Sequence, residues 1–358
     1  MSPAIPEVVR PVAEAVNGRL AALLGAEVDR WGGVDADLHE PFAALRTYVL
    51  AGGKRLRPAF CFWAFVGAGG RADDPAVTDA GAALEMLHTA ALIHDDIIDG
   101  SPRRHGADTV HVRFRELHRS RGWSGHPQHF GEGSAIVIGD LALVYSSRLM
   151  SGAPAEAAAV FEEMRLEVNV GQYLDVLGTA QGIADPEQGA ARAQRICRYK
   201  TAKYTIERPL HLGAALAAPG RLDELAGPLS EFGLPLGEAF QLRDDILGVF
   251  GDPAVTGKPV ADDLREGKPT LLASLAASRV TGRERRWFSD RFGAADLGEA
   301  DVLALQKLIE ETGARAEVEA TIASLVARSE AALERLRLTG QARDALGQLA
   351  RFVAGRDR

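Results

Sequence analysis

The segment that decides the fold runs from residue 84 to residue 99 and reads LEMLHTAALIHDDIID. Its apolar residues recur at steps of three and four, the pattern of a helix with an apolar stripe. The stripe ends in three carboxylates, Asp95, Asp96 and Asp99. At about 100° per residue, Asp95 and Asp99 are neighbours on one face, and His88 lies close to the same line. Carboxylates at a helix C-terminus oppose the helix dipole, so we expect positive charge to compensate them.

The same periodicity covers most long segments of the chain. Runs that alternate apolar and polar residues, as strands do, are hard to find, so we predict an all-α protein. The stretch Arg113–Gly133 is predicted to be a solvated loop or a broken pair of helices. No repeat or long linker divides the chain, so we expect residues 1–358 to form one domain. The clearest helical segments are Val77–Ile98, Ala153–Leu177, Gln188–Ala217, Leu225–Phe250, Thr270–Ala277 and Val302–Leu338.

Composition excludes several classes of protein. The 358 residues, 46% hydrophobic and 25% charged, are enough to bury a sizeable core. Two cysteines, Cys61 and Cys197, exclude a disulfide scaffold and favour a reducing, cytoplasmic location. A net charge of −8 argues against a nucleic-acid binder. The strongest apolar run, Ala135–Tyr145, contains Asp140 and is too short to cross a membrane, and the N-terminus lacks the apolar core of a signal peptide.

A second acidic helix end occurs at residues 240–248, which read FQLRDDILG. Asp244 and Asp245 lie late in an apolar segment, one turn after Gln241. Two such ends suggest facing acidic clusters in a helical bundle, able to hold a polyanion with Mg²⁺, which binds through one or two carboxylates plus substrate phosphates. The pair Asp73-Asp74 differs, because it precedes a proline in a Gly-rich turn where Asp commonly makes local hydrogen bonds. We interpret that pair as structural.

Basic motifs accompany the acidic ones. Residues 52–58 read GGKRLRP and place three cations after a glycine pair, a pattern suited to phosphate binding, although a basic turn before a helix is the plain alternative. Arg103 and Arg104 follow the first acidic cluster. Alternating carboxylates and cations favour a small diphosphate bound with metal ions. Further lysines near polar or Gly-rich breaks are Lys200, Lys203, Lys258 and Lys268.

Together these motifs resemble the trans-isoprenyl diphosphate synthase (polyprenyl synthetase) family from about Gly52 to Lys268, and the region Arg113–Gly133 is similar to its actinobacterial members. The resemblance implies a single large helical bundle of the type I isoprenoid synthase kind with a central cavity, a homodimer, and three Mg²⁺ ions. It implies an enzyme, a Mg²⁺-dependent transferase that condenses isopentenyl diphosphate with an allylic diphosphate, head to tail and in the trans configuration, by ionisation, condensation and elimination.

The resemblance also implies roles for individual residues. The metal ligands would be Asp95, Asp96, Asp99, Asp244 and Asp245. The isopentenyl diphosphate site would comprise Lys54, Arg57, His88 and Arg104. The allylic diphosphate site would comprise Arg103, Lys200, Thr201, Gln241, Lys258 and Lys268. Gly248 stands where the family has a third acid in the second motif, so that ligand is dispensable or is replaced by Asp252 or a water.

Product length is predicted from the helix before Asp95. Farnesyl synthases of the family often have aromatic residues four and five positions before the first Asp, where this chain has Ala91 and Ala90. One helical turn rises about 5.4 Å, close to one isoprene unit, so a deeper blocking residue permits a longer product. Leu87 and Leu84 lie deeper, with Tyr145 as a candidate floor. We predict geranylgeranyl diphosphate, C20.

Other functions stay open at this point. A longer polyprenyl or a farnesyl diphosphate product is one, and a non-catalytic partner subunit of a heteromeric synthase is another. A terpene cyclase shares the acidic helix ends but does not need the isopentenyl site of Lys54, Arg57 and His88.

Overall fold

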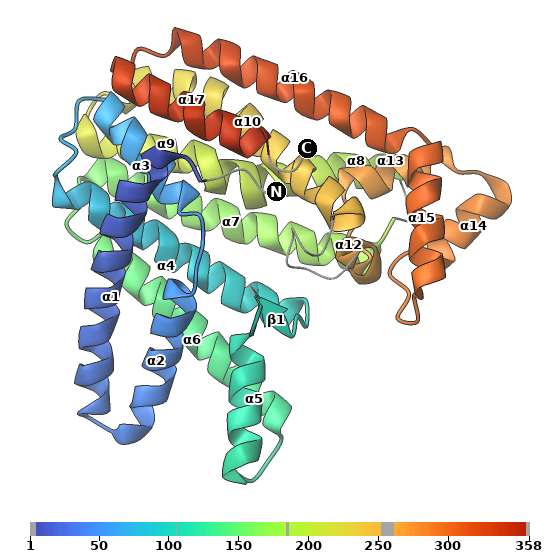
Figure 1. Ribbon diagram of the computed structural model, residues 1–358, viewed down its shortest axis with the longest axis horizontal. Helices are drawn as coiled ribbons and strands as arrows, with labels where there is room; N and C mark the ends of the chain where they lie inside the picture. The colour runs from blue at the N-terminus through green and yellow to red at the C-terminus, as the bar shows by residue number, and fades with distance from the viewer. Residues whose placement is uncertain (1–4, 105, 184–185, 252–260, 356–358) are drawn as a thin grey trace. The chain divides into compact units, whose positions relative to one another are not determined.

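The computed structural model describes residues 5–104, 106–183, 186–251 and 261–355, and its secondary structure there is almost entirely helical (Figure 1). This confirms the all-α prediction.

The strands in these ranges are β1 (Arg103–Arg104) and β2 (Ala107–Asp108), an antiparallel pair with Arg103 opposite Asp108. The short helices are η1 (Glu7–Val9) and η2 (Ala36–Leu38), and η3 (Cys197–Glu207) is a π-helix. The α-helices are α1 (Arg10–Gly32), α2 (His39–Leu50), α3 (Leu56–Gly67), α4 (Pro75–Ile98), α5 (Val110–Arg121), α6 (Pro127–Leu149), α7 (Ala155–Gln181), α8 (Pro186–Ile196), α9 (Arg208–Ala217), α10 (Leu222–Phe250), α12 (Asp262–Glu266), α13 (Leu271–Arg279), α14 (Gly282–Arg291), α15 (Glu299–Glu311), α16 (Ala314–Arg335) and α17 (Gly340–Ala354).

The chain folds into two compact units. The first unit contains Ile5–Ala159 and Pro209–Leu222, and the second contains Val160–Arg208 and the chain from Asp223 onward. The first acidic motif and the GGKRLRP motif lie in the first unit. The second acidic motif, Lys200 and Thr201 lie in the second.

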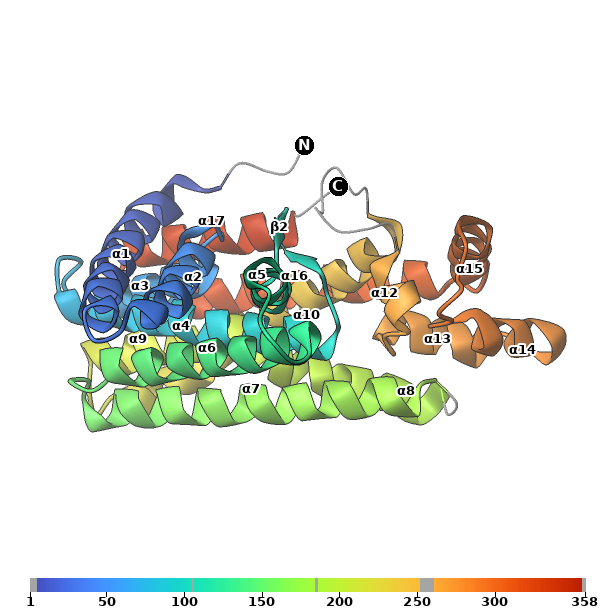
Figure 2. The same ribbon diagram turned by 90° about the horizontal axis from the view of Figure 1, so that it is seen from below.

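Helix α4 organises the first unit. It packs against α6, α3 and α1, and Figure 2 shows α4 and α6 side by side. Leu84, Met86, Leu87 and Ile93 are fully buried along it. Since long apolar side chains bury the most surface, these residues supply much of the free energy that fixes α4 in place.

Local signals set where α4 starts and stops. Asp74 precedes it and accepts a hydrogen bond from the Ala76 amide at 2.9 Å, the geometry of an N-cap. Asp73 pairs with Arg71 on the surface. These contacts support the structural interpretation of the Asp73-Asp74 pair. At the other end, α4 stops at Ile98, so all three predicted carboxylates lie in or next to its last turn.

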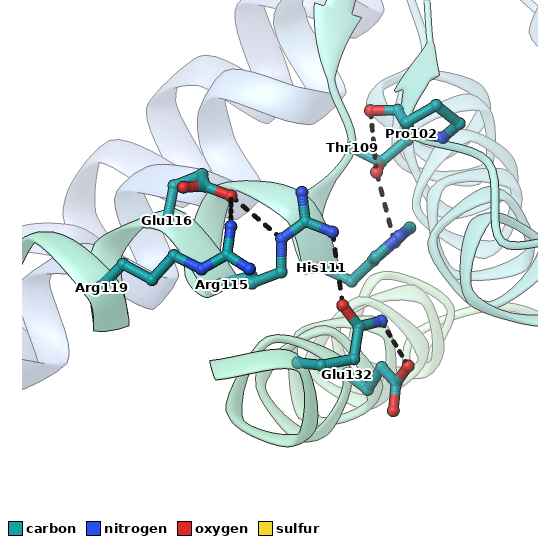
Figure 3. A network of polar contacts seen from close by, with 8 residues as sticks. Pro102, Thr109, His111, Arg115, Glu116, Arg119 and Glu132 are labelled. Atoms are coloured by element: carbon teal, nitrogen blue, oxygen red, sulfur yellow. Dashed lines mark hydrogen bonds and ion pairs between the residues drawn. The ribbon is translucent and has the colours of Figure 1, made fainter. Parts of the chain in front are cut away.

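The stretch Arg113–Gly133 is a broken pair of helices, formed by α5 and the start of α6, which pack against each other. Figure 3 shows the polar network between them. His111 is buried on α5, with its Nδ1 atom 3.2 Å from the Thr109 hydroxyl. Burial, followed by the charge of Arg115 on α5, lowers the pKa of His111, and the charge of Glu132 on α6 opposes that shift.

The second unit is built around α10. The apolar residues Leu242, Ile246 and Val249 of α10 share a buried cluster with residues of α13, α15 and α16. Side-chain hydrogen bonds add to this packing: Ser329 on α16 donates to the Phe232 carbonyl at 2.8 Å, and Gln306 on α15 donates to the Val249 carbonyl at 2.6 Å. Helix α10, whose C-terminal half carries the second acidic motif, is therefore held by contacts along its length.

Two predicted helical segments are interrupted. Gln188–Ala217 becomes α8, the π-helix η3 and α9, and Val302–Leu338 breaks after α15, where Gly313 adopts a positive φ of 71° before α16. Cys61 and Cys197 are buried free thiols, in keeping with the exclusion of a disulfide scaffold. In the described ranges, no helix is both long enough and apolar enough to cross a membrane.

Candidate active site

The first acidic cluster lies at the end of α4. Asp96 is 1% exposed, and each of its carboxylate oxygens accepts a hydrogen bond. Arg104 Nε donates to Oδ1 at 2.7 Å, and the Tyr48 hydroxyl donates to Oδ2 at 2.9 Å. Asp95, the preceding residue, and Asp99, at the C-cap, are half-buried. The positive charge expected beside these carboxylates is therefore present, in Arg104.

The charges at this helix end are coupled. Burial raises the pKa of Asp96, and the Arg104 charge opposes that rise. The same ion pair, working against burial, raises the pKa of Arg104. Because Asp96 and Arg104 each replace lost water contacts with this ion pair, Asp96 fixes the orientation of the guanidinium, which also feels the charge of Asp95.

The three cations of the GGKRLRP motif do not behave alike. Arg55 is 5% exposed and has a left-handed backbone, with φ 49°. It donates to Glu85 on α4 at 2.5 Å and to the Val49 carbonyl at 2.7 Å. Lys54 and Arg57, on either side of it, are half-buried. Arg55 therefore anchors the loop, and its two more exposed neighbours are the candidates for binding a ligand.

In the second unit, a hydrogen-bonded series joins three predicted site residues. The Thr201 hydroxyl, in η3, donates to Gln241 Oε1 at 2.5 Å, and Gln241 Nε2 donates to Asp245 Oδ1 at 2.7 Å. Asp245 is buried, and burial followed by the charge of Asp263 raises its pKa to about 8. A buried carboxylate with a raised pKa beside another acid is a site where a cation would be stabilised.

The remaining predicted cations are placed as follows. Lys200 Nζ lies 2.6 Å from Asp175 Oδ2 on α7, and Lys268 Nζ lies 2.8 Å from Glu266. Arg103 donates to the Gly106 carbonyl at 2.6 Å in the turn between β1 and β2. Lys258 and Asp252 lie outside the described residues.

The family model for polyprenyl synthetases matches residues 39–309. The chain belongs to the polyprenyl synthetase family. It is 34% identical over 251 residues to a geranylgeranyl diphosphate synthase of Mycobacterium tuberculosis, an alignment that covers 65% of each protein. It is 30% identical to a short chain isoprenyl diphosphate synthase of Methanothermobacter thermautotrophicus over 86% of this chain and 88% of that protein. As a member of this family, the chain is an enzyme of the transferase class.

Solved structures of the same family agree with the fold. A geranylgeranyl pyrophosphate synthase from Corynebacterium glutamicum, complexed with isoprenyl diphosphate and magnesium, is 38% identical and superposes with a TM-score of 0.89 over 98% of this chain and 99% of that one. A decaprenyl diphosphate synthase from Rhodobacter capsulatus is 26% identical, with a TM-score of 0.76 over 98% of each chain. These likenesses confirm the predicted family and its helical fold.

The donor set fits the Mg²⁺ that the family implies. Within the described residues, no three His, Cys, Asp or Glu side chains form a group able to hold a metal ion by themselves. Mg²⁺ commonly keeps several waters and uses one or two carboxylates together with substrate phosphates, so a complete protein cage is not needed. A more exposed carboxylate near a basic side chain, as with Asp95 and Arg104, suits that joint binding.

The residues predicted to set product length lie on α4. Ala90, Leu87 and Leu84 are fully buried, and Ala91 is half-buried. Tyr145 on α6 is 5% exposed, and its hydroxyl donates to buried Glu27 on α1 at 2.8 Å.

The sequence analysis did not identify the residues that form hydrogen bonds or ion pairs with the motif residues. Tyr48, Glu85 and Asp175 each pair with a motif residue from an element far away in the chain, and a single sequence carries no signal for such pairs. It also gave no role to Asp263, because the pair Asp262-Asp263 lies in the Gly- and Pro-containing stretch 251–269 and does not end an apolar helix.

Proposed function

We propose that this enzyme condenses isopentenyl diphosphate with an allylic diphosphate, head to tail and in the trans configuration, to give geranylgeranyl diphosphate. The observation that carries the proposal is the end of α4, where buried Asp96 pairs with half-buried Arg104 and the half-buried Asp95 and Asp99 lie in or next to the same last turn. At this helix end, carboxylates that could bind a metal ion lie next to a guanidinium that could bind phosphate. The names of the relatives from Mycobacterium and Corynebacterium support the C20 product.

The proposed roles follow the sequence motifs. Mg²⁺, three ions per site, would be held by Asp95, Asp96, Asp99, Asp244 and Asp245, and would supply charge stabilisation for the leaving diphosphate. Isopentenyl diphosphate would bind Lys54, Arg57, His88 and Arg104. The allylic diphosphate would bind Arg103, Lys200, Thr201, Gln241, Lys258 and Lys268.

The chain's own residues would do the positioning. Asp96 orients Arg104, Asp175 lies against Lys200, and Thr201 orients Gln241. Hydrogen-bond donors that are already fixed in place stabilise the transition state more than flexible ones, because they need no reorganisation when charge develops on the departing diphosphate. The isopentenyl double bond would then attack the allylic carbon, and loss of a proton would restore an allylic diphosphate. No protein nucleophile takes part.

Product length would be set by α4. Small side chains at Ala90 and Ala91 leave a C15 product unblocked, and the larger Leu87 and Leu84 lie one and two turns deeper. The bottom of the product cavity would lie at the level of Leu87 and Leu84, with Tyr145 contributing from α6.

We also propose a cytoplasmic homodimer in which the whole chain acts as one domain. Helix α7 supports the dimer, because Leu166, Val170 and Tyr173 are 60%, 45% and 68% exposed and are spaced four and three residues apart. That spacing gives an apolar stripe on one helix face, which a second copy would cover. Sedimentation of the purified protein tests the assembly.

The activity is tested by single-residue variants of the purified chain, with Mg²⁺, isopentenyl diphosphate and allylic primers. Asp95→Ala should abolish turnover, whereas Asp73→Ala, which alters an exposed pair with Arg71, should leave it unchanged. Turnover by the chain alone would exclude the alternative that it is a non-catalytic subunit of a heteromeric synthase. Hydrocarbon release without isopentenyl diphosphate would instead identify a cyclase.

A further inference from the structure

The helix that carries Lys200 and Thr201 has an unusual form. Both residues lie in η3, a π-helix between α8 and α9, where the sequence pattern predicts a continuous α-helix. Such helices are rare and occur mostly as single turns within α-helices, frequently at functional sites. A π-helix of 11 residues therefore needs contacts that hold it, and the same contacts set the positions of Lys200 and Thr201.

Two glycines bring neighbouring helices close to the backbone of η3. A Cβ atom on Gly171 of α7 would lie 2.8 Å from the Lys200 Cα atom, and one on Gly237 of α10 would lie 2.6 Å from the Ala202 Cα atom. Protein interiors are close-packed, and a backbone cannot give way as a side chain can, so a larger residue fits at neither position unless η3 moves. The segment 200–202 is therefore packed between α7 and α10.

Glu167 of α7 holds the C-terminal end of η3. Its side chain is 8% exposed, and Arg208 donates to both carboxylate oxygens, from Nε to Oε2 at 2.6 Å and from NH2 to Oε1 at 2.7 Å. Lys203 also donates to Oε1. Burial acts to raise the pKa of Glu167, but the hydrogen bonds from Arg208 and Lys203 bring it below its ordinary value, so the carboxylate is ionised at neutral pH. A bidentate pair of this kind is strong and directional.

The residues of α7 that contact η3 lie on one side of the helix. Glu167, Gly171 and Asp175 are spaced four residues apart, which places them on successive turns of that side. Asp175 accepts a hydrogen bond from Lys200 Nζ at 2.6 Å. Along α7, these three residues hold first the C-terminal end of η3, then the backbone of Lys200, and then the Lys200 side chain. Their spacing therefore fixes the register of η3 against α7.

We propose that Glu167 and Gly171 are positioning residues for the allylic diphosphate, because they hold η3 as a π-helix with Lys200 and Thr201 in place. The inference rests on the proposed function, which assigns Lys200 and Thr201 to that substrate. Both carboxylate oxygens of Glu167 are engaged by basic side chains, so it acts through η3 and not on the substrate. Loss of one π-helical turn would shift the register by one residue, a rotation of about 100°. Lys200 and Thr201 would then turn away from their present partners on α7 and α10.

The first test compares the KM values of the two substrates for Glu167→Gln, which keeps the size of the side chain and removes its charge. The KM for the allylic diphosphate should rise roughly tenfold, because a charged and a neutral donor are displaced together, and the KM for isopentenyl diphosphate should stay within about twofold. Amide hydrogen exchange over residues 197–207 should become faster, because fewer contacts hold η3. Asp301→Asn, which breaks an ion pair with Arg291 elsewhere in the same unit, is the control and should change none of these values.

A pair of glycine variants tests the inference independently if Glu167→Gln fails to fold. Gly171→Ala places a Cβ atom against the Lys200 backbone and should raise the KM for the allylic diphosphate selectively. Gly178→Ala makes the same change on the same helix, where the nearest atom is Pro269 Cγ at 3.3 Å, and should keep the wild-type KM values.

The outcomes separate this inference from the proposed function. Equal rises in both KM values, or wild-type KM values in Glu167→Gln and Gly171→Ala, would overturn the inference in an enzyme that still makes prenyl diphosphates. A wild-type chain that extends no allylic primer would overturn both.

Discussion

Arg55 and Glu85 form a buried ion pair, with NH1 of the arginine 2.5 Å from Oε2 of the glutamate and both side chains about 5% exposed. Arg55 Nε also donates to Asn17 on α1 at 2.9 Å. One guanidinium thus ties the loop that carries Lys54, and the start of α3 that carries Arg57, to α1 and α4. The pair makes the loop's geometry depend on a residue that touches no substrate in our account.

Removing one partner of this ion pair should lower the stability of the folded protein. Arg55→Met leaves Glu85 buried without its countercharge, and we expect a loss of about 3–5 kcal/mol in the free energy of unfolding, measured in urea. The double variant Arg55→Met, Glu85→Leu should lose less, since no charge is left unpaired. Arg71→Met, which breaks the exposed pair with Asp73, should have no measurable effect. Equal losses for the buried and exposed pairs would contradict this account.

The hydrogen bond from Thr201 to Gln241 should matter for the allylic substrate alone. Thr201→Val removes the hydroxyl that orients Gln241, at a cost of about 1 kcal/mol, which corresponds to a roughly fivefold higher KM for the allylic diphosphate. The KM for isopentenyl diphosphate should not change. Thr47→Val, which removes a hydroxyl bonded only to the Ala43 carbonyl of its own helix, is the control. A similar rise in both KM values would mean that Thr201 acts on the fold instead.

Ala90→Phe should shorten the product toward C15. An aromatic ring at this buried position would close the path of the growing chain one turn above Leu87. The larger side chain also overpacks α4, at a typical cost of about 1–3 kcal/mol, so Tm is measured alongside the products. Chromatographic sizing of dephosphorylated products gives the readout. An unchanged chain-length distribution from a folded variant would count against α4 as the wall.

Stability should fall below about pH 6.5 through His111. Its pKa is lowered in the folded state, so the unfolded chain binds the proton more readily and acid favours unfolding; the contribution is fully present above the unfolded pKa. His111→Gln should reduce the drop in Tm between pH 7.5 and 5.5. His126→Gln, at an exposed position, should retain the wild-type drop. If both variants retain it, another group is responsible.

Much of the architecture follows from local pattern, and the α4 segment shows why. Its apolar stripe, N-cap and terminal carboxylates are all encoded within residues 74–99, so periodicity alone predicts the helix and its end. The interior breaks are harder to predict. The π-helix η3 sits inside a continuous helical pattern, and nothing in the local residues distinguishes it from an α-helix.

The candidate site likewise has features that local sequence predicts and features that it does not. The acidic and basic motifs are visible in sequence, but the partners that orient them lie far away in the chain. Arg55 is indistinguishable from Lys54 and Arg57 until its contact with Glu85 is known, and Asp263 gains significance only through its charge acting on Asp245. A single sequence does not encode these distances in any local pattern.

The most direct test of the central claim is incubation of the purified chain with Mg²⁺, isopentenyl diphosphate and allylic primers of each length, followed by sizing of the products. The account predicts Mg²⁺-dependent chain extension that stops at C20 from every shorter primer. Extension that continues well beyond C20, or no extension with any primer, would contradict it.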